Sequence, residues 1–99
     1  MCIRDRITVD DIAGDPAVPV VDVREQDEWD AGHVPHAIHI PMGEVVERLD
    51  EVPDGAAIIC HSGGRSARVV QYLESQGRVA ANVVGGTSAW IAAGHDVAR

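Results

Sequence analysis

A cysteine stands where an apolar run gives way to a glycine-rich loop, in the stretch IICHSGGRSARVV at residues 58–70. Ile58 and Ile59 are typical of the end of a buried strand, and an amphipathic helix is expected to begin at Ser66. The residues between them are too few and too rich in glycine for anything but a tight loop. Cys60 is therefore expected at a strand-to-helix turn, where a helix offers its unpaired N–H groups.

Such a turn favours negative charge on the cysteine. The unpaired N–H groups and the helix dipole stabilise an anion there, whether a thiolate, a persulfide or a bound oxyanion. Gly63 and Gly64 let the backbone curl so that successive N–H groups converge on one point, and Arg65 adds a permanent positive charge. These surroundings predict a lowered pKa for the Cys60 thiol and hence a nucleophile at neutral pH. The alternative is a structural cysteine beside a glycine turn.

Strands and helices alternate along the chain around this loop. After a short extended start, apolar runs too short for helices predict buried strands at residues 18–24, 37–41, 56–60 and 79–86. Helices are expected after Thr8 as N-cap, over 25–32, along the stripe of Met42, Val45, Val46 and Leu49, over 66–77, and around Thr87 as a cap. The strands are continuously apolar, which is typical of a parallel sheet covered by helices on both faces. In such sheets ligands bind at the carboxyl ends of strands, and Cys60 ends one.

Length, composition and net charge limit the classes of protein to which this chain can belong. A length of 99 residues with 45% hydrophobic residues predicts one globular domain. We assign that domain to residues 7–99, after a poorly patterned extension over residues 1–6 that contains Cys2. The net charge is −8 and no basic stripe is present, which argues against nucleic-acid and anionic-membrane partners. No signal peptide or membrane-spanning run is evident, so a reducing cytoplasm, in which a lone thiol stays free, is expected.

Several stretches, in order and spacing, resemble the rhodanese domains. CHSGGRS is similar to the active-site loop of that family, often written C-x-x-G-x-R-S. VVDVREQDEWDAGHVPHAIHIP resembles its D-V-R…E-[YW]…G-H-I-P-G-A-x-N-I-P signature, and VVGGTSAW with Gly94 resembles its closing G-G-x-x-A-W…G. His36 stands where the family has glycine, and His39 where it has asparagine. The resemblance implies a rhodanese-like three-layer α/β/α fold with a central, mostly parallel sheet of about five strands.

The resemblance implies that the protein would be a thiosulfate sulfurtransferase. Cys60 would take a sulfane sulfur from a donor such as thiosulfate, become a persulfide, and pass the sulfur to cyanide or a thiol. The backbone cradle agrees, since both steps place negative charge on sulfur beside Cys60. Asp22 and Arg24 would brace the sheet, with a direct substrate contact as the alternative. No cofactor beyond the persulfide is implied, and a thioredoxin or a sulfur-carrier protein stays open as the acceptor. The substrate-binding residues would be His61, Ser62, Gly63, Gly64, Arg65 and Ser66.

Two other activities share part of this pattern. A cysteine phosphatase or arsenate reductase also uses a cysteine-to-arginine anion loop, with the spacing C-x5-R. Only four residues separate Cys60 from Arg65 here, and the tighter loop should suit one sulfur atom better than a phosphate. The other alternative is a catalytically silent rhodanese used as a binding module, which would most simply have lost the cysteine.

Three histidines share the spacing H-x2-H-x2-H, namely His33, His36 and His39. Pro35 breaks any helix that would align them, and the family motif accounts for His33, so no metal site is expected. Trp29 and Trp90 are expected to be core anchors, because large aromatic side chains chiefly supply buried area.

Overall fold

The computed structural model describes residues 6–15 and 17–99. Arg6, placed by the sequence argument in the unpatterned extension, already pairs with Asn82 in the first strand. The rest of that extension, Cys2 included, lies outside the described residues.

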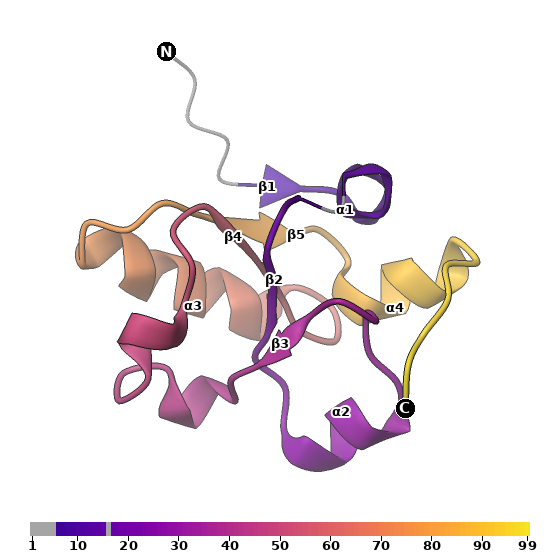
Figure 1. The fold of residues 1–99 in the computed structure, drawn as a ribbon, viewed down its shortest axis with the longest axis horizontal. Helices are drawn as coiled ribbons and strands as arrows, with labels where there is room; N and C mark the ends of the chain where they lie inside the picture. The colour runs from indigo at the N-terminus through magenta and orange to yellow at the C-terminus, as the bar shows by residue number, and fades with distance from the viewer. Residues whose placement is uncertain (1–5, 16) are drawn as a thin grey trace.

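A five-stranded sheet forms the centre of the fold (Figure 1), and all of its strand pairs are parallel. Its spatial order is β1-β5-β4-β2-β3. The strands are β1 (Arg6–Ile7), β2 (Val20–Asp22), β3 (Ile38–His39), β4 (Ala56–Ile59) and β5 (Ala80–Val83). This confirms the predicted α/β class and parallel sheet. Because β4 is the middle strand, Cys60 leaves the sheet at the centre of its carboxyl edge.

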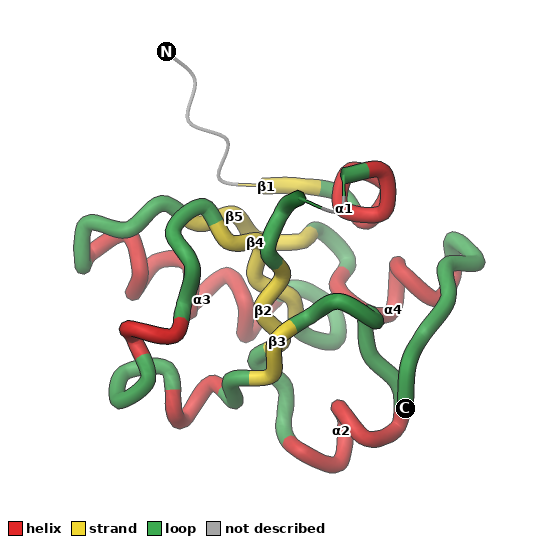
Figure 2. Tube along the Cα trace, viewed as in Figure 1, coloured by secondary structure: helices red, strands yellow, loops and turns green. Residues whose placement is uncertain are grey.

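Four α-helices accompany the strands in the described part of the chain, whereas the alternating pattern predicts five. They are α1 (Val9–Gly14), α2 (Gln26–Ala31), α3 (Gly64–Ser75) and α4 (Gly86–Ala92). Thr8 caps α1, since its side chain accepts the N–H of Asp11 at 3.2 Å. Gly32 ends α2 as expected, whereas α3 begins at Gly64, two residues before the predicted start. Figure 2 shows the strands between α3 on one side and α4 on the other.

The two faces of the sheet bury separate apolar clusters, because alternate strand residues point to opposite sides. On the α3 side, Ile58 and Cys60 pack with Val69, Val70 and Leu73. On the other side, Ala57 and Ile59 of the same strand pack with residues of α1 and α4, namely Val9, Ile12 and Trp90. The chain is thus a three-layer α/β/α fold, and Cys60 faces the α3 layer.

The single helix predicted along Met42, Val45, Val46 and Leu49 is wrong. The segment forms two 3₁₀ turns, η1 (Met42–Glu44) and η2 (Leu49–Glu51), joined by irregular turns. Gly43 and two adjacent β-branched valines are poor helix formers, and Arg48 departs from helical geometry at φ −108° and ψ 25°. Val45 is buried, but Val46 is 64% exposed. Part of the apolar stripe therefore faces outward.

Thr87 does not cap the last helix, contrary to prediction. Gly85, with φ +77°, is the N-cap of α4, and Thr87 lies inside the first turn. Its backbone N–H donates to the carbonyl of Cys60 at 2.8 Å. The start of α4 is thereby fastened to the loop that follows β4.

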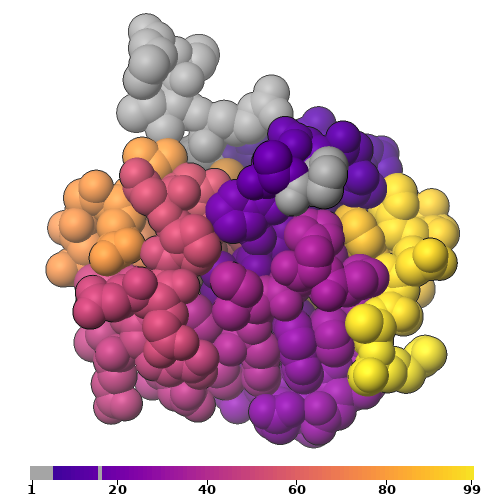
Figure 3. Space-filling view, viewed as in Figure 1, coloured from indigo at the N-terminus to yellow at the C-terminus, as the bar shows by residue number. Residues whose placement is uncertain are grey.

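The C-terminal segment returns to the end of α2, as Figures 1 and 3 show from the same side. His33 and Ala98 form an antiparallel bridge, and the Arg99 Nε donates to the carbonyl of Ala31 at 3.1 Å. Within residues 6–15 and 17–99, no helix has the length and apolar character needed to cross a membrane.

Candidate active site

Cys60 lies at the base of the loop, directly after β4. Its side chain is 1% exposed, whereas those of His61 and Ser62, the next two residues, are exposed. The Cys60 Sγ accepts the backbone N–H of Gly63 at 3.1 Å and lies 3.3 Å from the Ser66 Oγ. Cys60, Gly63 and Ser66 of the predicted site therefore meet at one sulfur atom.

The two glycines of the loop have different roles. Gly63 is the N-cap of α3 and adopts φ +107°, a conformation that other residues rarely adopt. This conformation aims its N–H at the Cys60 sulfur. Gly64 is the first residue of α3, has no positive φ, and has open space where a Cβ would stand. The curl expected from both glycines thus depends on Gly63.

Burial and hydrogen bonding act in opposite directions on the pKa of the Cys60 thiol. Burial raises this pKa, because a thiolate removed from water is less stable. The hydrogen bonds of the Ser66 side chain, and those from the backbone N–H groups of Ser66, Gly63 and Ser62, outweigh burial and lower the pKa. The direction agrees with the sequence argument, and its main cause is local hydrogen bonding.

Ser66 is fully buried and has one hydroxyl proton for two neighbours. Its hydroxyl donates to the Oδ1 of Asn82, and the Nδ2 of Asn82 donates to the carbonyl of Gly63 at 3.2 Å. With Cys60 protonated, its S–H can donate to the Ser66 Oγ. With Cys60 ionised, the Ser66 hydroxyl can turn to donate to the sulfur. Ser66 can therefore satisfy either charge state of the thiol.

From the sequence, Arg65 is expected to offer its positive charge to the substrate, but the structure shows it paired with a carboxylate. Its guanidinium donates to both carboxylate oxygens of Glu28, at 2.7 and 2.8 Å. The hydrogen bonds from Arg65 lower the pKa of Glu28 from 4.5 to about 2, and Glu28 raises the pKa of Arg65 further. The pair joins α2 to the first turn of α3, and so fixes one side of the loop.

The first turn of α4 holds the other side. The N–H groups of Thr87 and Ser88 donate to the carbonyls of Cys60 and His61, at 2.8 and 3.0 Å. Gly86, with φ +58°, permits this approach, because a Cβ there would lie 2.3 Å from the carbonyl oxygen of Cys60. Gly86 of the closing glycine pair is thus required by the backbone of the loop, whereas a Cβ at Gly85 would meet the Ala89 side chain of α4 at 2.6 Å.

Asp22 and Arg24 form a buried ion pair behind the loop. The Arg24 Nη2 lies 2.8 Å from the Asp22 Oδ2 and also donates to the carbonyl of Gly32 at 2.8 Å. These bonds tie the end of β2 to the end of α2, which carries Glu28. The geometry supports the bracing role proposed from the resemblance.

Trp29 is not a core anchor of the kind predicted, whereas Trp90 is buried in the α4-side cluster. The Trp29 ring stacks with the rings of both His33 and His39, with centroids 3.5 and 4.7 Å away. His36 is exposed. Among the described residues, no group of three His, Cys, Asp or Glu side chains could hold a metal ion.

Sequence reasoning assigned no role to Glu28, Asn82 or Gly86. A signal existed for Asn82, since it is the only polar residue inside the apolar run VAANVV. The signal for Gly86 was that it forms an adjacent pair with Gly85. Nothing local marks Glu28 as the partner of Arg65, because 37 residues separate them.

A family model for the rhodanese-like domain matches residues 7–93. The chain belongs to the rhodanese-like domain family. YtwF of Bacillus subtilis, whose name describes a sulfurtransferase, is 40% identical to it over 81 residues, which are 80% of this chain and 79% of that protein. YrkF of the same organism, whose name describes a sulfur carrier protein, is 39% identical over 82 residues but is covered for only 44% of its length. The crystal structure of a rhodanese-related protein from Thermoplasma volcanium superposes with a TM-score of 0.88, at 33% identity over 94% of this chain and 96% of that one.

Membership explains why the sequence motifs converge in space. Residues 60–63 form the loop and residues 64–66 begin α3. The D-V-R motif supplies the buried ion pair of Asp22 and Arg24, and Gly86 allows α4 to approach the loop. The names of its relatives support sulfurtransferase activity in general.

Proposed function

We propose that the protein is a sulfurtransferase that carries a sulfane sulfur on Cys60, taken from a small donor such as thiosulfate and delivered to cyanide or a thiol. The observation that carries this proposal is the environment of the Cys60 sulfur. The backbone nitrogen of Gly63 lies 3.1 Å from the Cys60 Sγ, and hydrogen bonds lower the pKa of the Cys60 thiol. The free thiol suits a reducing compartment such as the cytoplasm.

The first step is a displacement at sulfur. The Cys60 thiolate attacks the outer sulfur of thiosulfate, the sulfur–sulfur bond of the donor breaks, and sulfite leaves with the bonding electron pair. Cys60 becomes a persulfide whose negative charge lies on the transferred sulfur. The backbone N–H groups of Ser62, Gly63 and Ser66 stabilise that charge.

In the second step, the sulfur is transferred from Cys60 to the acceptor. A nucleophilic acceptor attacks the outer sulfur, and the bond to the Cys60 Sγ breaks. Cys60 leaves as a thiolate, stabilised by the Gly63 N–H and Ser66 as before. Cyanide yields thiocyanate, and a thiol yields its persulfide. No redox cofactor is needed, because each step exchanges one sulfur–sulfur bond for another bond to sulfur. A thioredoxin or a sulfur-carrier protein would serve equally as the thiol.

Steady-state transfer from thiosulfate to cyanide tests the proposal. The wild-type protein should form thiocyanate, and Cys60→Ser should form none while keeping its fold by circular dichroism. Hydrolysis of an aryl phosphate should stay at background, since the loop spacing suits one sulfur atom. A competent phosphatase that forms no thiocyanate would overturn the proposal.

A further inference from the structure

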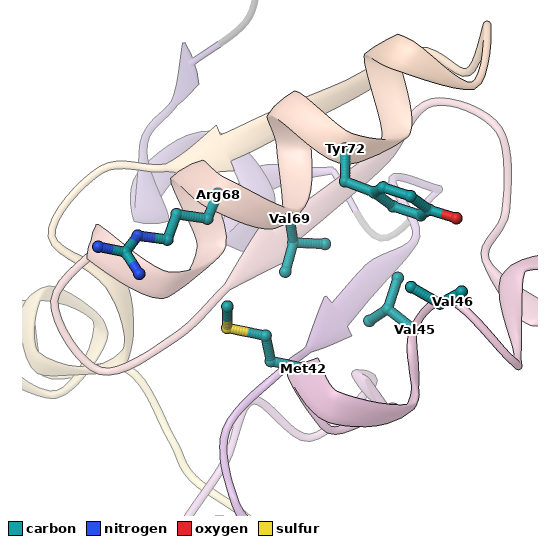
Figure 4. A pocket seen from close by; sticks show the side chains of 6 residues that line it. All are labelled: Met42, Val45, Val46, Arg68, Val69 and Tyr72. Carbon is teal, nitrogen blue, oxygen red and sulfur yellow. The ribbon is translucent and has the colours of Figure 1, made fainter.

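An apolar groove runs between α3 and the segment that follows β3 (Figure 4). Its volume is about 230 Å³, and it is lined by Met42, Val45, Val46, Arg68, Val69 and Tyr72. Side chains from the two elements face each other across it, with Arg68 at one end and Tyr72 toward the other. It exists because residues 42–51 form 3₁₀ turns, so that the apolar stripe is only partly buried.

Backbone hydrogen bonds place one end of the groove beside the active-site loop. The Met42 N–H donates to the carbonyl of Val23 at 2.9 Å, and the Val23 N–H donates to the carbonyl of Ile59 at 3.0 Å. Met42 is thus two strand spacings, or about 10 Å, from the end of β4, where Cys60 lies. Arg68 is less than one helical turn beyond Arg65.

The groove also shares its floor with the active-site cysteine. Val45 and Val69 belong to the same apolar cluster as Cys60, and Met42 and Tyr72 pack against that cluster. A molecule lying in the groove would rest on side chains of the apolar cluster that contains Cys60.

Arg68 supplies an unused positive charge at the loop end of the groove. Arg24, Arg48 and Arg65 each hold a carboxylate. The Arg68 side chain is exposed and has no hydrogen bond or ion pair within the described part of the chain. On a protein with a net charge of −8, an unpaired arginine beside an apolar groove is complementary to a small anionic, partly apolar molecule.

We propose that this groove selects the acceptor of the second step, a small thiol with a carboxylate near its sulfur and a short aliphatic tail. The inference rests on the proposed sulfurtransferase function. The carboxylate pairs with Arg68, the tail lies against Val45, Val46 and Val69, and the sulfur projects toward the loop. The groove volume of about 230 Å³ leaves room for a short aliphatic tail.

The chemistry of transfer to such a thiol is balanced without a further reactant. The acceptor thiolate attacks the outer sulfur of the Cys60 persulfide, forming a new sulfur–sulfur bond. The bond to the Cys60 Sγ breaks, Cys60 leaves as a thiolate, and the acceptor departs as a persulfide. Its carboxylate and tail are unchanged, so they act through binding alone.

Single-turnover transfer from a preloaded protein separates these contributions. The protein is loaded with thiosulfate, freed of excess donor, checked by intact mass, and mixed with 2-mercaptohexanoate, 2-mercaptoacetate or 2-mercaptoethanol. The first thiol has the tail and the carboxylate, the second lacks the tail, and the third lacks both. The measured quantity is the second-order rate constant of each acid relative to that of 2-mercaptoethanol.

Two variants and one control test the groove. Val46→Asp should lower the ratio for 2-mercaptohexanoate about tenfold, because it places a charge against the tail. Arg68→Gln should lower the ratio about threefold for both acids, as expected for an exposed ion pair. The control Val79→Asp makes the same change at another exposed valine, which is 53% exposed and not part of the groove, and should leave all ratios unchanged.

The outcomes distinguish the groove from the activity on which it rests. Ratios that are equal in wild type, Val46→Asp and Arg68→Gln, with the persulfide formed in each, overturn the groove alone. A decrease of the same size in Val79→Asp also overturns it. A wild-type protein that gains no sulfur from any donor overturns the proposed function and this inference together. Val46 is 64% exposed and Arg68 is exposed, so both variants are expected to fold, which a melting curve checks.

Discussion

Glu28 and Arg65 form a two-point ion pair that fastens α2 to the start of α3, with N–O distances of 2.7 and 2.8 Å. The side chains are 30% and 36% exposed, respectively. Such a pair contributes modestly to stability, but it determines where the loop ends and which charge lies beside it. The structure therefore gives Arg65 a positioning role, and its charge serves the anionic donor only in the proposed function.

Glu28→Gln should make the pH dependence of stability less steep in acid. The pKa of Glu28 is lowered by Arg65, so its ionisation stabilises the folded state above pH 4.5, and that contribution is lost as the pH falls toward 2. The variant should be less stable than wild type at pH 7 by about 1 kcal/mol. Urea unfolding at several pH values measures the difference. A gap that stays constant from pH 7 to pH 2 would contradict this assignment.

Arg65→Ala should slow sulfur uptake from thiosulfate about tenfold, because the variant loses both the tether to α2 and a positive charge beside an anionic donor. Arg48→Ala is the matched control, since Arg48 also holds two carboxylates, those of Glu44 and Glu51. The measurement is the rate of persulfide formation by quenched-flow mass spectrometry. Equal rates in the Arg65→Ala variant and wild type would show that the backbone N–H groups suffice.

Ser66→Ala should raise the pKa of the Cys60 thiol. The variant removes the side-chain hydrogen bond that helps outweigh the effect of burial, while the backbone N–H groups of the loop remain. The rate of iodoacetamide alkylation against pH reports the pKa as its inflection. The inflection should move to higher pH, and an unchanged inflection would mean that Ser66 donates only to Asn82.

Substitution of the two loop glycines should have unequal effects. Gly63→Ala forces φ +107° on a residue with a Cβ, and should cost about 1–2 kcal/mol and misdirect the N–H that reaches Cys60. Gly64→Ala occupies open space in a helical position and should leave stability equal or raise it by about 0.5 kcal/mol. Thermal unfolding and thiocyanate formation compare the two. Equal losses in both variants would contradict the distinct roles assigned to them.

The layers and the position of Cys60 could be predicted because they depend on local patterns. Continuous apolar runs mark strands buried on both faces, and Thr8 and Gly32 mark helix ends through their own chemistry. The thiol was placed at a strand end for the same reason. The prediction of a helix across residues 42–49 was wrong because periodicity shows only which side chains are apolar. Whether the backbone forms a helix there depends on the helix propensity of the residues.

The details of the site depend on contacts between distant segments. Glu28 lies 37 residues from Arg65, and Asn82 lies 16 residues from Ser66. No spacing within either segment encodes which partner it meets, so sequence reasoning left Arg65 free and Asn82 without a role. The stacking of Trp29 on two imidazoles has another origin, because His33 lies only four residues further along the chain. Gly32 ends α2 between Trp29 and His33, so helical spacing does not predict this contact.

Intact-protein mass spectrometry after incubation with thiosulfate tests the central claim most directly. The wild-type protein should gain one sulfur atom, a reductant or cyanide should remove it, and peptide mapping should place it on Cys60. Cys60→Ser should gain none. A wild-type protein of unchanged mass, or an added sulfur that maps to Cys2, would contradict the account.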